Sequence, residues 1–78
     1  MEQYYIQNGY VGNALCWWRE NSRGYTTNLE EAGKYSRKEA DTMNREDDVP
    51  WPCSYIDACE KAKKVVVDAQ YLDFNKRL

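Results

Sequence analysis

The chain has 78 residues, 42% hydrophobic and 31% charged, with a formal net charge of −2 and a pI near 5.0. This length supports one domain with a single thin core, and the composition lies outside the range that is typical of disordered chains. The acidic balance argues against direct binding of nucleic acid, because phosphate recognition usually leaves a basic patch on the protein.

The cysteine spacing and the absence of histidine argue against a metal site. The three cysteines, Cys16, Cys53 and Cys59, lack the paired close spacing of a zinc site, and histidine is absent. We therefore expect no metal and no cofactor. The opening "MEQYY" has no apolar signal region, and no run is long enough to span a bilayer, so we expect a cytoplasmic protein with free thiols.

Two strands are predicted near the N-terminus. Residues 3–7, "QYYIQ", are rich in β-forming side chains and end at Asn8–Gly9, a strong turn signal. Tyr10–Asn13 contains a second glycine and predicts an irregular connection. Ala14–Arg19, "ALCWWR", then predicts an antiparallel second strand.

Two helix starts follow, each with a threonine or serine three residues before a glutamate. Thr27 with Glu30 predicts one capping box, and the short helix after it ends at Gly33 in a left-handed conformation. Ser36 with Glu39 repeats the pattern and predicts a helix from Arg37 to about Arg45.

The segment "EDDVPWP", residues 46–52, predicts a charged loop in which Pro50 and Pro52 hold their preceding residues extended. Trp51 is either a plug over the core or an exposed anchor, and we favour the plug. The acids at its start are interpreted as solvated, although phosphate mimicry is the alternative.

The last third of the chain supports two interpretations. We favour a short helix capped by Ser54, with Asp57 completing the box, followed by a third strand from about Lys64 to Tyr71. Continuation of the helix through residues 64–71 stays open, because the apolar residues also follow helical spacing. Residues 73–78 predict a frayed tail.

These elements predict an α+β fold in a single domain over residues 1–78, with a three-stranded antiparallel sheet covered on one face by short helices. Alternation then places two sets of side chains on opposite faces. The helix-covered core receives Tyr4, Ile6, Leu15, Trp17, Val65, Val67, Ala69 and Tyr71. The open face receives Tyr5, Gln7, Cys16, Trp18, Val66, Asp68 and Gln70.

The open face is the predicted partner-binding surface. Large exposed aromatic side chains among polar groups mark contact surfaces, and Trp18 with Tyr5 as its neighbour fits this description. The predicted contact residues are Tyr5, Gln7, Trp18, Asp68 and Gln70. The alternative, that the tail or the loop around Trp51 folds over Trp18, stays open.

The stretch from Gly12 to Ala40, with "GN", "WW" and "GYTTNLEEAGKYSRKEA", resembles a pattern in small uncharacterised proteins of bacteriophages and prophages. The ending "VVVDAQYL" is similar to theirs as well. That class includes inhibitors of host defence such as anti-CRISPR proteins. The resemblance implies stoichiometric binding of a host protein in the cytoplasm of a bacterium, and it carries no catalytic residues.

We therefore expect a non-enzymatic protein-binding module. A cysteine nucleophile is the only tempting catalytic group, and without histidine it lacks its usual base. A structural or accessory phage protein that pairs with a second copy through a sheet edge, as a homodimer, is the alternative.

Overall fold

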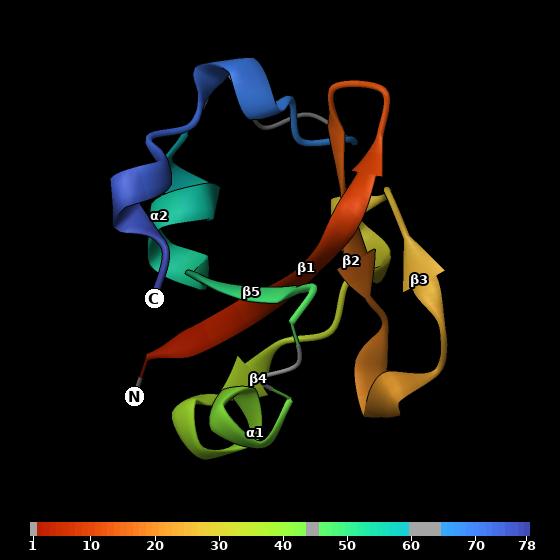
Figure 1. The fold of residues 1–78 in the computed structure, drawn as a ribbon, viewed down its shortest axis with the longest axis vertical. Coiled ribbons are helices and arrows are strands. Elements are labelled where there is room, and N and C mark those ends of the chain that lie inside the picture. The colour runs from red at the N-terminus through yellow and green to blue at the C-terminus, as the bar shows by residue number, and fades with distance from the viewer. Residues whose placement is uncertain (1, 44–45, 60–64) are drawn as a thin grey trace.

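The computed structural model describes residues 2–43, 46–59 and 65–78. Strands and helices both occur, and the strands form a curled antiparallel sheet (Figure 1), which confirms the α+β class. The strands are β1 (Gln3–Val11), β2 (Ala14–Trp18), β3 (Tyr25–Thr26), β4 (Tyr35–Ser36) and β5 (Asp48–Pro52). The α-helices are α1 (Arg37–Thr42) and α2 (Cys53–Ala58); the 3₁₀ turns are η1 (Glu20–Ser22), η2 (Leu29–Glu31), η3 (Ala69–Tyr71) and η4 (Phe74–Lys76).

Strand β1 is the centre of the sheet. Its C-terminal half pairs with β2 from Gln7 to Val11, and its first residues pair with β4. Strand β5 pairs with β1 from Tyr4 to Asn8. Because Tyr4 and Gln7 each have partners in two strands, β5 lies on one edge of β1 and the other two lie on the opposite edge. The prediction of three strands is therefore wrong, since the described residues form five.

The Asn8–Gly9 pair lies inside β1 and does not end it. The register shifts between Gln7 and Tyr10, and Gly9 has a φ of 74°. This is a bulge, in which a glycine takes the left-handed conformation that other residues avoid. The hairpin turn comes at Gly12–Asn13 instead, where φ of Gly12 is 62°.

The predicted loop at residues 46–52 is in part strand β5, and the loop prediction is wrong for Asp48–Pro52. The extended conformation expected before each proline is also strand conformation. The carbonyl of Pro50 accepts the Leu78 N–H at 2.9 Å, so Pro50 faces away from β1. Pro50 and Pro52 thus place their missing N–H groups on the outer edge, where a sheet tolerates proline.

The helix predicted after the prolines exists as α2, but its cap is wrong. Pro52 is the N-cap without a side-chain hydrogen bond, and Ser54 lies inside the helix with its hydroxyl directed to Glu2 at 3.2 Å. The predicted third strand is also wrong over the described residues 65–71. Only residues 67–68 form bridges, and Ala69–Tyr71 is the turn η3. Lys64 lies outside the described residues.

Residues 73–78, predicted as a frayed tail, carry η4 and contact the rest of the fold. The ring of Phe74 meets that of Trp51 edge-on at 5.6 Å, and the Leu78 amide bonds to β5. Figure 1 shows this segment beside α2.

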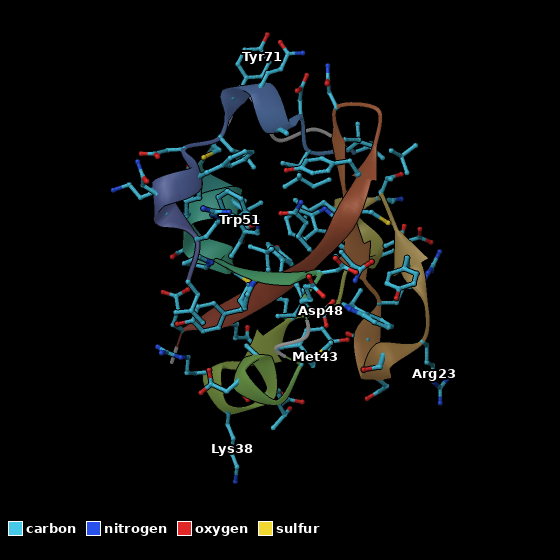
Figure 2. The ribbon with its side chains drawn as sticks, viewed as in Figure 1. Arg23, Lys38, Met43, Asp48, Trp51 and Tyr71 are labelled. Carbon is cyan, nitrogen blue, oxygen red and sulfur yellow. The ribbon has the colours of Figure 1, made fainter. Side chains whose placement is uncertain are left out.

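The core consists of two clusters on opposite sides of β1. The major cluster combines Tyr5, Leu15, Trp17 and Trp51 with Ile56 of α2 and other residues. The minor cluster combines Tyr4, Ile6 and Tyr35 with Ala40 of α1. Helices therefore cover both faces of β1, and the prediction of one covered face is wrong. The predictions that Trp17 and Trp51 are buried are confirmed, since both are 0% exposed; Figure 2 shows Trp51 between α2 and the sheet.

The two predicted capping boxes differ in outcome. The Ser36 box is confirmed, with the Ser36 hydroxyl accepting the Glu39 N–H at 3.1 Å and the Glu39 carboxylate accepting the Ser36 N–H at 3.0 Å. The helix after it ends at Thr42 rather than near Arg45, which lies outside the described residues. The Thr27 box is wrong, because Asn28 caps η2 by accepting the Glu30 N–H.

Gly33 is not left-handed either. Its N–H donates to the Trp18 carbonyl, and a Cβ there would lie 2.8 Å from the Glu20 nitrogen. Glycine is required at this position by the close approach of two backbones.

Candidate partner-binding site

The structure separates the five predicted contact residues. Gln7 pairs with Trp17, so Gln7 and Tyr5 lie on the Trp17 side of the sheet and not beside Trp18. Both are buried, at 4% and 3% exposure. The bulge at Asn8–Gly9 shifts the pairing of β1 with β2 by one residue. Such a shift reverses which β1 side chains share a face with Trp17. Tyr5 and Gln7 are thus core residues.

Both of these buried residues are hydrogen-bonded inside the fold. The Gln7 Oε1 accepts the Trp51 indole N–H at 2.8 Å, and the Tyr5 hydroxyl donates to Asp57 at 2.8 Å. Burial, together with the Asp57 carboxylate, raises the pKa of Tyr5. These bonds hold β1 to β5 and α2, so the two side chains serve the interior of the fold.

Asp68 and Gln70 lie at the far end of β2 from Trp18. Asp68 bridges Ala14, and its carboxylate accepts the Gln70 N–H at 2.9 Å. Ala14 and Trp18 share a face but lie four residues apart, which corresponds to about 13 Å along a strand. Of the predicted set, Trp18 alone remains in a surface aromatic cluster.

That cluster is the Trp18–Tyr25 ledge, formed by Trp18 of β2 and Tyr25 of β3. The two residues pair across the sheet, and their ring centroids are 4.3 Å apart. Trp18 is half-buried against the minor cluster, whereas Tyr25 is 48% exposed. The ledge presents two adjacent aromatic surfaces at the edge of the sheet.

A hydrogen bond fixes the orientation of the Trp18 indole. Its N–H donates to Asp48 Oδ1 at 2.9 Å, and the same oxygen accepts from the Asn8 amide at 2.8 Å. Asp48 is 6% exposed at the start of β5. A tryptophan held in this way loses little rotamer freedom when a partner packs on it.

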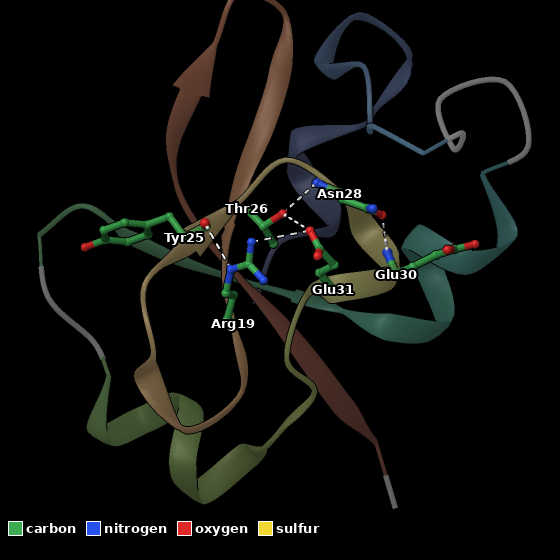
Figure 3. A network of polar contacts seen from close by, with 6 residues as sticks. All are labelled: Arg19, Tyr25, Thr26, Asn28, Glu30 and Glu31. Atoms are coloured by element: carbon green, nitrogen blue, oxygen red, sulfur yellow. Dashed lines mark hydrogen bonds and ion pairs between the residues drawn. The ribbon is translucent and has the colours of Figure 1, made fainter.

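A polar network positions Tyr25 (Figure 3). Arg19 donates to the Tyr25 carbonyl at 3.3 Å and contacts Glu31 at 3.4 Å. Glu31 also accepts the Thr26 hydroxyl at 3.0 Å, and Thr26 in turn accepts the Asn28 N–H. The network ties β3 to η2 while the Tyr25 ring points away from it.

The turn that leads into β3 is anchored by Tyr35. The Tyr35 hydroxyl donates to the Arg19 carbonyl and accepts the Ser22 N–H at 3.2 Å. Asn21 and Ser22 both have positive φ, near 55°, which this anchor holds in place. The turn that joins the two strands of the ledge is therefore fixed in conformation.

Sequence reasoning missed Tyr25 and Asp48. The six residues "RENSRG" between Trp18 and Tyr25 contain the signal for the first, because a turn there brings "YTT" back beside "WW". Nothing local indicates Asp48, whose partner Trp18 lies 30 residues away.

The Cys53 thiol offers little reactivity. Burial, and secondarily the Asp57 charge, raises the pKa of Cys53 to about 12, so this thiol stays protonated at neutral pH. Cys16 and Cys59 are half-buried and free. Within the described ranges no group of three or more metal-binding side chains lies together.

In the part of the chain that the structure describes, no helix is long and apolar enough to cross a membrane. Comparison of the chain with protein-family models, with curated proteins and with solved structures gave no match.

Proposed function

We propose that this protein is a non-enzymatic binding module that holds a protein partner on the Trp18–Tyr25 ledge. The observation that carries the proposal is the orientation of Trp18, which is fixed by Asp48 and lies in tilted ring contact with the exposed Tyr25. Tryptophan and tyrosine dominate the residues that contribute most to binding energy at protein interfaces.

The proposed partner is a host protein in the cytoplasm of a bacterium, and the proposed outcome is its inhibition by stoichiometric binding. The resemblance to small bacteriophage and prophage proteins, which include anti-CRISPR proteins, supports this part of the proposal. A ledge without a catalytic group suits inhibition by occupation of a surface.

The test compares the parent chain with Trp18→Ala, Tyr25→Ala and the control Tyr71→Ala. Tyr71 is 56% exposed on η3 and projects away from the fold (Figure 2). Each chain is expressed in a bacterium with CRISPR immunity, and phage plating is counted. We expect the parent and Tyr71→Ala to restore plating, and both ledge variants to fail.

Purified chains complete the test. Each purified chain is titrated with the CRISPR effector of the host used for plating. The binding free energy of the one-to-one complex should weaken by about 2 kcal/mol or more in either ledge variant, as for a residue that dominates an interface. Equal plating and equal affinity for all four chains would contradict the use of the ledge. Failure of the parent chain to restore plating would contradict the inhibitor role.

A further inference from the structure

A second surface lies on the other side of the sheet, where β1 continues beyond the start of β5. Strand β5 begins at Asp48, opposite Asn8, whereas β1 runs on to Val11. Gly9–Val11 therefore have β2 on one edge and, within the described residues, no strand on the other. We call this segment the Tyr10 edge.

The backbone groups of Tyr10 point to this open side. Leu15 donates its N–H to the Val67 carbonyl, so Leu15 faces away from β1. Tyr10 is the partner of Leu15, and opposed residues of an antiparallel pair face the same way relative to the ladder between them. The Tyr10 N–H and C=O thus face away from β2, as an unpaired edge presents them.

Two other edges of the sheet are closed. The outer edge of β5 carries two prolines without N–H groups, and the Pro50 carbonyl already accepts from Leu78. The Tyr25 carbonyl of β3 accepts from the Arg19 side chain. At the Tyr10 edge the Gln7 side-chain amide reaches the Gly9 carbonyl at 3.4 Å, but the segment carries no proline and, in the described structure, no side chain bonds to the Tyr10 backbone.

A groove of about 400 Å³ lies beside the Tyr10 edge, a volume at the lower end of the range for ligand sites. Its lining includes Gly9, Tyr10, Phe74, Arg77, Glu46 and Asp47. Tyr10 is 53% exposed and Phe74 39% exposed. Two accessible rings thus line a space next to an unpaired strand.

The charges around the groove select its occupant. Glu46 and Asp47 are exposed where the chain turns into β5, next to the open edge. Arg77 also lines the groove, but its guanidinium is held on Phe74, 5.5 Å from the ring centroid and with its Nε–H donating to the Phe74 carbonyl. A second copy of this chain would bring its own two acids to the same place, and like charges disfavour that pairing.

We propose that the Tyr10 edge binds an extended, basic segment of a partner protein by β-strand addition. The segment lies in line with β5 and exchanges hydrogen bonds with the Tyr10 backbone. A lysine or arginine stem packs on the Tyr10 ring, and its cation meets Glu46 and Asp47. This surface is separate from the Trp18–Tyr25 ledge, because Tyr10 shares a face with Leu15 of the major cluster.

The test uses the full chain and two blocked hexapeptides, one alternating valine with lysine and the other valine with glutamate. Backbone amide NMR follows each titration. We expect the lysine peptide to shift the signals of Gly9, Tyr10, Val11 and Phe74 and to slow hydrogen exchange at the Tyr10 amide. The glutamate peptide should leave these signals unchanged.

Variants separate this surface from the ledge. Glu46→Gln with Asp47→Asn should weaken binding of the lysine peptide about three- to tenfold, as expected for two exposed charges. Tyr10→Ala should weaken it, whereas Tyr25→Ala, a tyrosine of similar exposure on the ledge, should bind like the parent. The spectrum of each variant without peptide confirms that it is folded.

Three results would overturn the proposal. They are equal binding of both peptides, signal shifts at Trp18 and Tyr25 but not at Tyr10, and concentration-dependent shifts at Tyr10 without peptide. The last result would assign the edge to a second copy of the chain. None of the three contradicts binding at the ledge, so the two proposals fail separately.

Discussion

The Trp51 indole N–H donates to the Gln7 side chain at 2.8 Å in the interior between β5 and β1. These residues are 44 positions apart in the sequence, and both are buried. The bond satisfies a polar group that would otherwise lie unpaired in the core.

Replacement of Gln7 by methionine should therefore destabilise the protein by about 1–3 kcal/mol, because the Trp51 N–H loses its acceptor. Gln70→Met is the matched control, since Gln70 is exposed, and it should change stability by less than about 0.5 kcal/mol. Urea denaturation followed by tryptophan fluorescence measures both. Equal midpoints for the two variants would contradict the buried role of Gln7.

The adjacent tryptophans should respond differently to truncation. Trp17→Ala empties a fully buried site and should cost about 3–5 kcal/mol. Trp18→Ala should cost less, about 1–2 kcal/mol, because the side chain is half-buried with one hydrogen bond. Denaturant melts of both variants check the order. A larger loss for Trp18 would show that the ledge is structural.

Trp17→Phe tests the contribution of the Trp17 indole N–H at the same buried position. Trp17 Nε1 is buried without a partner in the described part of the chain. Phenylalanine removes this N–H and keeps an aromatic ring, so the variant should lose clearly less stability than Trp17→Ala. Denaturant melts compare the stability of Trp17→Phe with that of Trp17→Ala. Equal losses of stability in the two variants would indicate an unseen partner for the indole N–H.

The caps predict a contrast between three polar residues. Ser36→Ala and Asn28→Ala should each cost about 0.5–2 kcal/mol, because each side chain satisfies a backbone N–H. Thr27→Ala should stay within about 0.5 kcal/mol, since Asn28 and not Thr27 caps η2. Thermal melts by circular dichroism give the comparison. If Thr27→Ala lost as much stability as Asn28→Ala, Thr27 would be a helix cap after all.

Gly33→Ala should destabilise the protein by about 1–3 kcal/mol, because the new Cβ meets the backbone of Glu20 at 2.8 Å. A backbone atom yields less easily than a side chain. The neighbouring exposed residue provides the control, as Lys34→Ala should be nearly neutral. If Gly33→Ala melts like the parent, η1 is not held against this glycine.

Stability should fall as the pH rises above about 9. The ordinary pKa of a cysteine is 9.0, and burial raises that of Cys53 to about 12. Between these values the unfolded chain releases the Cys53 proton and the folded chain keeps it, so alkali favours unfolding. Urea midpoints between pH 8 and 11 should decline less steeply in Cys53→Ala. Identical slopes would contradict the burial of this thiol.

Local signals in the sequence identified the Ser36 cap and the burial of Trp17, because each depends on a few neighbouring residues. The face of Tyr5 could not be found in this way. It depends on the bulge at Asn8–Gly9, and the same two letters equally predict a hairpin turn. Strand β5 could not be predicted because two of its five residues are prolines. A sheet tolerates proline only at an edge, and the sequence does not show that this segment lies at one.

The candidate site was recognised only in part. Alternation along β2 placed Trp18 outside the Trp17 cluster, which is correct, but its neighbours come from other parts of the chain. Tyr25 follows a six-residue turn, and Asp48 arrives from the far side of β1. Such neighbours follow from the tertiary fold, and no periodicity in the strand itself encodes them.

The central place of β1 also sets the order of events during synthesis. Asn8 and Asp48 are 40 residues apart, so β1 leaves the ribosome long before β5 exists. At ordinary translation speeds this delay is about 2–8 s. During that time β1 has β2 and then β4 as partners, but Tyr5 lacks Trp51 and the other residues of the major cluster that follow β4. The young chain is therefore most exposed to aggregation and to chaperones just before residues 48–52 emerge, and the finished sheet forms late.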